Sequence, residues 1–233
     1  MDLKGLQLAS RLAMSPNQLG YCGHDTAGAV FHDCILHDNC QHVEAEIKNF
    51  IVLNPYLQTI SKILKKPLTS LAVVEAYWLG NSHLRKIKQS DYSLLLDNFA
   101  IQGVPPWLIA ELRQTPPQNF IPTHLFQVLH VGVGRASGSV PYNLDSINNC
   151  MVRWGTVQSI SDHIVVELNS LDKKDNTYKL VKKIATVKFD PELLLGISVG
   201  QTIIVHWGWA VKILTIPETK KLSFWTKAVL SSF

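Results

Sequence analysis

The chain has 233 residues, of which 46% are hydrophobic and 17% charged, and its net charge is +4. This composition suits one or two globular domains and excludes a disordered chain. Its lysines are scattered in pairs and form no basic stripe, so we expect no nucleic-acid partner. No stretch approaches the roughly 18 apolar residues of a membrane helix, so we expect no membrane partner either.

The four cysteines, Cys22, Cys34, Cys40 and Cys150, are spread unevenly along the chain. They are too few for the disulfide framework of a small secreted protein, and the first residues lack the apolar core of a signal peptide. We therefore expect a reduced, cytoplasmic protein whose cysteines pack in the core or bind metal instead of forming bridges. The stretch 32–42 is dense in histidine, aspartate and cysteine, but it has no CxxC or HxxxH spacing and is read as a solvated helix face.

The first part of the chain, residues 1–120, is predicted to be a helical domain. Apolar residues recur there at steps of three and four, and prolines or polar turns interrupt the pattern. The expected helices cover approximately residues 3–14, 27–50, 56–66, 70–87, 90–99 and 107–113.

The pattern changes in residues 121–149, which are predicted to hold a strand and a connector. Residues 124–133 are an apolar run typical of a strand, and residues 134–149 are rich in turn formers. Short β-segments then recur, with charged or glycine-containing turns between them, at 152–159, 163–169, 178–187, 202–206 and 210–214. Closely spaced strands of this kind predict a small barrel. The tail from Lys220 is expected to be a short helix or a loose strand, and the fold class is α+β.

Two motifs in this β-rich part carry a resemblance to a known family. The first is Cys150-Met-Val-Arg-Trp-Gly-Thr-Val, and the second runs from Val199-Gly200 through His206-Trp-Gly-Trp-Ala to Val211. Together they resemble the HypC/HupF family of hydrogenase-maturation chaperones. The family opens with a cysteine before a Gly-x-Val strand and later has a Val-Gly…His-x-Gly-aromatic-Ala segment.

The resemblance implies that residues 150–233 form a HypC-like, OB-like β-barrel. It also implies an accessory protein, more plausibly not an enzyme, that binds or delivers iron or its Fe(CN)2CO unit in nickel–iron hydrogenase maturation. Its partners would be proteins of the hydrogenase assembly machinery, and its metal ligands would be Cys150 and His206. The family's cysteine is the first residue after Met removal, whereas Cys150 is internal, and Trp154 stands where proline is common.

The whole chain also resembles an uncharacterised bacterial family, through residues 16–23, 74–81 and 124–128. This second resemblance implies no activity.

Residue chemistry leaves several alternatives open. Thiolate and imidazole suit iron, but Cys150 and His206 can equally be buried core residues. Either His124 or His130 is a candidate third ligand. A competing hypothesis is a cysteine-dependent enzyme with a pocket between the helical domain and the barrel. It would use Cys22, whose pKa a helix start would lower, together with His124.

No Gly-x-Ser-x-Gly elbow and no phosphate-binding glycine loop occurs in the sequence. A third hypothesis is a plain interaction module that has no metal site.

Overall fold

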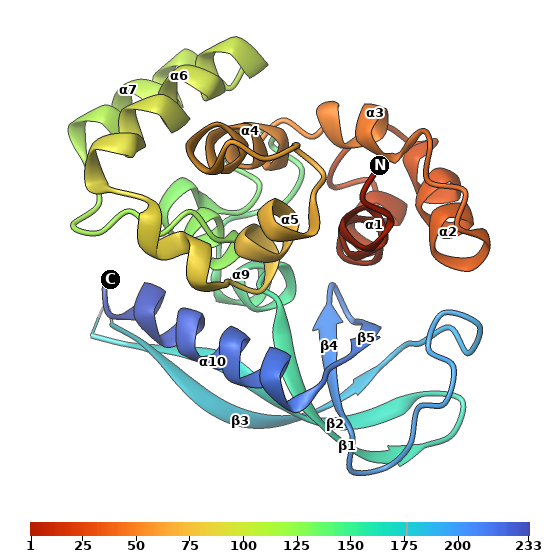
Figure 1. Ribbon diagram of the computed structural model, residues 1–233. Helices are drawn as coiled ribbons and strands as arrows, with labels where there is room; N and C mark the ends of the chain where they lie inside the picture. The colour runs from red at the N-terminus through yellow and green to blue at the C-terminus, as the bar shows by residue number, and fades with distance from the viewer. Residues whose placement is uncertain (176) are drawn as a thin grey trace.

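The computed structural model describes residues 1–175 and 177–233, and shows a layer of helices above a curved sheet (Figure 1). Helices make up the first part of the chain. They are α1 (Leu3–Gln18), α2 (Ala27–His37), α3 (Val43–Lys48), α4 (Leu53–Leu64), α5 (Leu71–Trp78), the 3₁₀ helices η1 (Ser82–Lys86) and η2 (Gln89–Asp91), α6 (Tyr92–Gln102) and α7 (Pro106–Gln114). The predicted helical N-terminal part is therefore confirmed.

Two predicted helices are wrong in their extent. The helix expected over 70–87 ends at Trp78, and Gly80, with φ of 75°, separates it from the 3₁₀ helix η1. The helix expected over 27–50 is two helices, because α2 ends at His37, and the next residue, Asp38, adopts a left-handed conformation with φ of 58°. A left-handed residue is a common way to end a helix, and aspartate tolerates it better than most side chains. The chain then turns before α3 begins.

The strand expected over 124–133 is also wrong, because these residues form helix. Thr123 caps the short helix α8 (His124–Phe126) by accepting a hydrogen bond from the Phe126 amide. The π-helix η3 (Gln127–Gly132) follows, and then α9 (Leu144–Cys150) inside the predicted connector. An apolar run that is buried on several sides does not distinguish a helix from a strand by periodicity.

The sheet has five antiparallel strands in the order β3-β2-β1-β4-β5. The strands are β1 (Arg153–Ile160), β2 (Ile164–Lys174), β3 (Thr177–Val187), β4 (Thr202–His206) and β5 (Trp209–Ile213). They agree with the predicted segments except that β2 continues past the predicted end at residue 169 to Lys174. The sheet is open and the predicted closed barrel is not formed. In the described part of the chain, the two edges meet only through an isolated bridge between Lys188 and Trp209.

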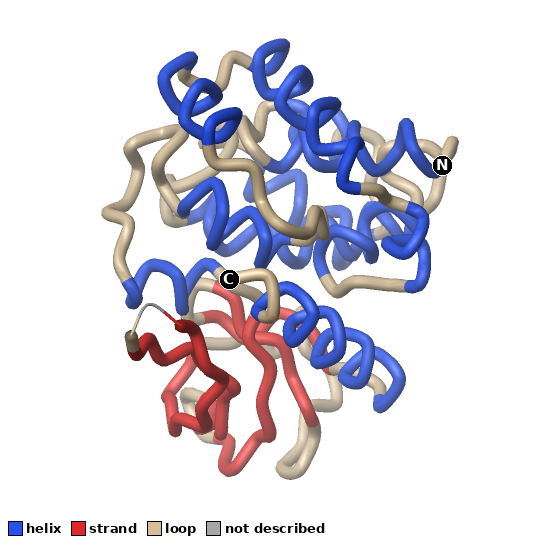
Figure 2. Tube along the Cα trace, turned by 90° about the vertical axis from the view of Figure 1, so that its left-hand side faces the viewer, coloured by secondary structure: helices blue, strands red, loops and turns tan. Residues whose placement is uncertain are grey.

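The tail is the helix α10 (Ile216–Leu230), which lies between the sheet and the upper helices (Figure 2). Thr215 and Glu218 form a capping box at its start, a signal that the sequence contains as Thr-x-x-Glu. Trp225 of α10 packs against Gly80, where an added Cβ would come within 2.3 Å of the indole ring. The main hydrophobic core extends from Leu6 to Val229 and joins the helical layer to the sheet, and a second, smaller core around Val166 and Val205 lies within the sheet.

Candidate metal centre

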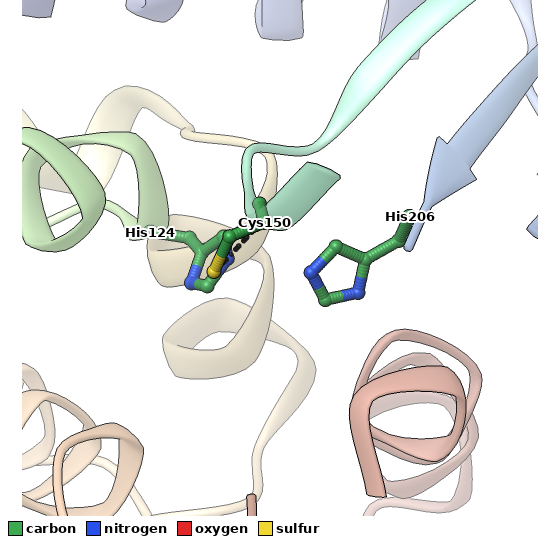
Figure 3. A group of neighbouring side chains, drawn as sticks. All are labelled: His124, Cys150 and His206. Carbon is green, nitrogen blue, oxygen red and sulfur yellow. Dashed lines mark hydrogen bonds between the residues drawn. The ribbon is translucent and has the colours of Figure 1, made fainter. Parts of the chain in front are cut away.

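Three buried side chains meet where the helices and the sheet face each other. His124 begins α8, Cys150 ends α9 and His206 ends β4 (Figure 3). One potential ligand atom from each residue lies within 4.8 Å of the other two. The side chains are 3%, 8% and 1% exposed, respectively. The structure thus brings the predicted pair Cys150 and His206 together and adds His124, which the sequence suggested both as a third ligand and as an enzyme residue.

A proline in α1 sets the orientation of His206. Pro16 has no N–H, so the carbonyl of Leu12, four residues earlier, lacks its usual helical donor. His206 supplies the missing proton, with Nδ1 at 2.7 Å from the Leu12 oxygen. Because a carbonyl only accepts, Nδ1 carries the proton and Nε2 carries the lone pair. The Ser15 hydroxyl also donates to the His206 carbonyl, at 3.1 Å, and ties the end of β4 to α1.

The Nε2 atom of His206 is buried, and among the described residues it has no well-aligned hydrogen-bond partner, the Cys150 carbonyl being its polar backbone neighbour. An unsatisfied buried acceptor costs about 1–3 kcal/mol, so such atoms are rare without a reason. A bound metal ion would use this lone pair, and the bond from Nδ1 to a carbonyl is the usual support of a metal-binding histidine.

His124 has a partner for its proton on either ring nitrogen. Its Nε2 lies 2.7 Å from the Cys150 carbonyl, and its Nδ1 lies 2.8 Å from the Tyr77 hydroxyl. Tyr77 in turn donates to the side-chain oxygen of Gln127. Because a carbonyl only accepts, Nε2 carries the proton in this structure. To bind a metal through Nε2, which lies 3.7 Å from the Cys150 sulfur, His124 has to give up this bond and move its proton to Nδ1, which then donates to Tyr77. That tautomer is the one a metal ligand requires.

The electrostatics of the cluster favour neutral groups. Burial lowers the pKa of His206 to about 4 and holds the pKa of His124 well below its ordinary value. Burial also raises the pKa of the Cys150 thiol well above its ordinary value. Both imidazoles are neutral; His206 would bind a metal as it stands, His124 would do so after its proton moves to Nδ1, and the thiol would lose its proton to a bound cation. The residues present therefore fit a transition-metal ion.

The cluster forms one wall of a pocket of about 370 Å³. Helix α1, the turn after it, the 49–53 turn, α5 and residues 132–140 supply the other walls. Within residues 1–175 and 177–233, no Asp, Glu, Lys or Arg lines this pocket. The volume exceeds what one ion needs, since a water molecule occupies about 30 Å³ in the liquid. The pocket therefore has room for further ligands of the metal.

Cys22 lines the same pocket and is an exposed residue. Desolvation of its thiol, which faces the pocket, raises its pKa to about 11, so the predicted lowering by a helix start is wrong. The prediction failed because α2 begins only at Ala27, which leaves Cys22 in the preceding turn. Both proposed pairs, Cys150 with His206 and Cys22 with His124, thus lie around one pocket. His130 lies elsewhere, with Nε2 at 2.8 Å from the Tyr92 hydroxyl.

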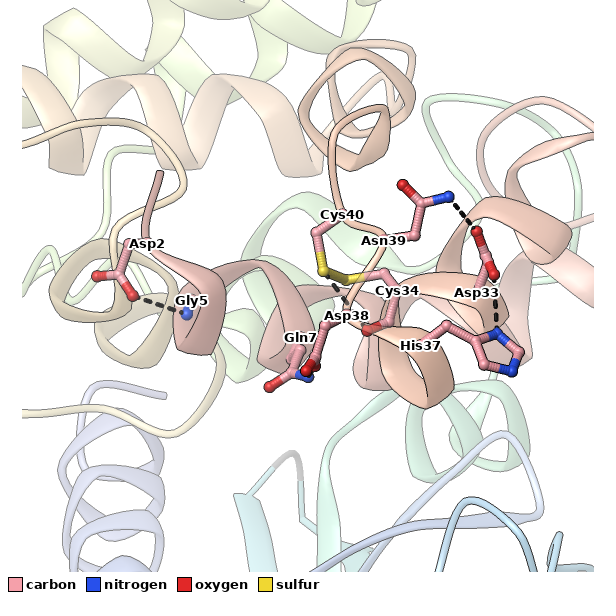
Figure 4. Close-up of a disulfide and its surroundings, with 9 residues drawn as sticks. All are labelled: Asp2, Gly5, Gln7, Asp33, Cys34, His37, Asp38, Asn39 and Cys40. Carbon is pink, nitrogen blue, oxygen red and sulfur yellow. Dashed lines mark hydrogen bonds and ion pairs between the residues drawn. A yellow bond between two sulfur atoms is a disulfide. The ribbon is translucent and has the colours of Figure 1, made fainter.

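Cys34 and Cys40 form a disulfide, so the prediction that no bridge forms is wrong for this pair (Figure 4). Because α2 ends at His37, the chain turns back and brings the two Cα atoms within 4.4 Å. Nearby, Asp33 accepts hydrogen bonds from His37 at 2.9 Å and Asn39 at 2.5 Å. The polar residues of 32–42 thus surround a short buried bridge.

A larger hollow of about 560 Å³ lies between α5 and α10. Lys221 and Glu75 form an ion pair there at 2.8 Å, and Trp225 lines one side. In the part of the chain that the structure describes, the only group of three or more clustered metal-ligating side chains is His124, Cys150 and His206, so the smaller pocket is the candidate site.

The chain belongs to a family of unknown function, DUF6390, whose family model matches residues 1–233. The predicted membership of an uncharacterised family is therefore confirmed over the whole chain. No curated protein and no solved structure matches the chain. No helix among the described residues is long and apolar enough to cross a membrane.

Proposed function

We propose that this protein binds a transition-metal ion, iron being the leading candidate, and acts as an accessory protein that carries the metal. Its ligands are His124, Cys150 and His206. The observation that carries the proposal is the buried Nε2 of His206, which faces a thiol and a second imidazole without a well-aligned hydrogen-bond partner among the described residues. One soft and two borderline donors favour iron, zinc or copper over magnesium or calcium.

The raised thiol pKa values favour a metal carrier over the cysteine-dependent enzyme. A nucleophilic cysteine needs a lowered pKa or an adjacent base. Cys22 has a pKa of about 11, and burial raises that of Cys150 well above its ordinary value. Both thiols are therefore protonated at neutral pH. A metal cation reverses this at Cys150, because it stabilises the thiolate directly.

The more specific assignment is nickel–iron hydrogenase maturation, with an iron unit such as Fe(CN)2CO as cargo. It rests on the HypC/HupF-like motifs around Cys150 and His206, and on the size of a pocket that can hold a metal together with small ligands. Under this proposal the protein works in the cytoplasm with partners of the hydrogenase assembly machinery.

Metal analysis of protein purified without oxygen tests the proposal. The parent protein should bind about one Fe²⁺ per chain, as expected for a single site with three ligands. The variants Cys150→Ala and His206→Ala should lose it. His163→Ala changes a histidine in an exposed turn outside the pocket and is the matched control.

Infrared spectra of protein co-expressed with hydrogenase assembly proteins should show CN and CO bands. Bound iron without these bands would reject the hydrogenase assignment and keep the metal site. Equal iron in the parent and in Cys150→Ala would reject the site itself.

A further inference from the structure

The turn that carries Cys22 is held at the mouth of the pocket from two sides. The buried amide of Asn17 donates to the carbonyls of Cys22 and His24, at 2.9 Å and 2.7 Å. On the other side, the ring of Tyr21 packs against Trp207, with 4.6 Å between the ring centroids. Trp207 follows the proposed ligand His206 directly, so this turn is attached to the site itself.

The charges around the pocket leave a bound metal incompletely neutralised. A divalent ion bound by two neutral imidazoles and one thiolate has a net charge of +1. No Asp or Glu lines the pocket in the described part of the chain. An unpaired charge away from water is costly, so a bare divalent ion, bound without cyanide or another anionic ligand, needs one more anion. The Cys22 thiol lines the pocket and becomes an anion, and a soft metal ligand, by losing one proton.

We propose that Cys22 is a fourth and exchangeable ligand, which binds the metal held by His124, Cys150 and His206 and closes the mouth of the pocket over it. This inference rests on the proposed metal-binding function. On binding, each thiol releases one proton to solvent and forms one sulfur–metal bond. Two thiolates and two imidazoles then surround a divalent ion with no net charge, and no electron is transferred.

Cys22 is not part of the 4.8 Å cluster, so the turn must move inward to complete the site. Two glycines flank it, Gly20 and Gly23, and both have positive φ values, 71° and 78°. Glycine adopts such backbone conformations at little cost, which allows the turn to change near Gly20, where an added Cβ would meet no heavy atom within 4 Å. Gly23 is packed against Phe50 and Asn17 bonds the turn, so the inward movement has to carry or break these contacts.

The positions of the two cysteines suggest different roles. Cys150 is buried and binds from inside, whereas Cys22 belongs to an exposed turn that can be reached from solvent. An incoming thiol of a partner protein can therefore replace Cys22 first, while the inner three ligands still hold the metal. The metal thus enters and leaves the carrier through exchange of the Cys22 ligand.

Cobalt(II) binding measures the number of thiolate ligands directly, since thiolate-to-cobalt charge transfer absorbs in the near ultraviolet. The experiment uses a Cys34→Ala, Cys40→Ala background, in which Cys22 and Cys150 are the only cysteines left. Proton release on Co²⁺ addition is measured in weakly buffered solution. The background protein should release about two protons per Co²⁺, because each bound thiol must ionise.

In this background, Cys22→Ala should still bind Co²⁺, with about half the charge-transfer absorption and about one proton released. A chelator should remove Co²⁺ faster from this variant than from the background protein. Ser161→Ala, which changes a small exposed side chain outside the pocket, is the matched control and should behave as the background protein.

Unchanged absorption and proton release in Cys22→Ala would overturn the role of Cys22 and leave the three-ligand site intact. Failure of the background protein to bind Co²⁺ would overturn both this inference and the proposed function.

Discussion

Replacing His206 by phenylalanine separates the effect of the site on the stability of the metal-free protein from its effect on metal affinity. In the metal-free protein, the change removes the buried Nε2 that has no well-aligned partner in the described structure, which relieves about 1–3 kcal/mol. It also removes the 2.7 Å bond from Nδ1 to Leu12, and leaves that carbonyl without a donor at a similar cost. The two effects oppose each other, so the free energy of unfolding should change by only about 1 kcal/mol.

Metal affinity should respond very differently. Mutating a residue that hydrogen-bonds to a metal ligand typically weakens metal binding by roughly 10–100-fold. Loss of the ligand itself should weaken binding by more than this. Urea denaturation of the metal-free protein and competition with a chromophoric chelator measure the two quantities. His130→Phe is the control, because it breaks a hydrogen bond to Tyr92 away from the pocket and should leave the affinity unchanged. A metal-free His206→Phe protein that is several kcal/mol less stable yet binds metal normally would refute the reasoning.

Three further predictions concern stability. Reduction of the Cys34–Cys40 disulfide should lower the free energy of unfolding by about 2 kcal/mol, as expected for so short a loop, and urea curves with and without reductant measure it. Burial lowers the pKa of His130 to about 4, so the unfolded state binds more protons between pH 4 and 6.5. Stability should therefore fall as the pH falls through this range, by up to about 3 kcal/mol from this residue, and His130→Phe should show a smaller fall than the parent. Gly80→Ala should lower the melting temperature and destabilise the protein by about 2 kcal/mol or more. Gly80 has a φ of 75°, and the new Cβ would clash with Trp225 of α10. An unchanged melting temperature would contradict this contact.

The sheet was predictable because its signals are local. Alternating apolar residues and charged turns indicated five strands, and the structure has them at nearly the predicted positions. Whether the sheet closes into a barrel depends on how its edges meet, and here the contact is limited to Lys188 and Trp209 in the described residues. Such long-range geometry leaves no periodic signal in the sequence.

The helical half was less predictable at its breaks. Asp38 ends α2 through its own left-handed conformation, so no proline or glycine marks the turn that brings Cys34 and Cys40 together. The apolar residues after Thr123 have a composition typical of a strand. Threonine is also a common N-cap residue, and here it caps α8. That error concealed the position of His124, which reaches the site only because α8 points it toward Cys150.

The orientation of His206 in the site follows from the proline in α1, which the sequence analysis treated only as the end of a helix. Pro16 interrupts the hydrogen bonds of α1 and frees one carbonyl, that of Leu12. The sheet uses this acceptor to hold His206, so a local rule about proline determines which imidazole nitrogen faces the pocket. Residue 16 and residue 206 are far apart in sequence, and no spacing rule connects them. The same α1 segment also leads into the turn of Cys22, which explains how two site hypotheses that seemed separate in the sequence describe one pocket.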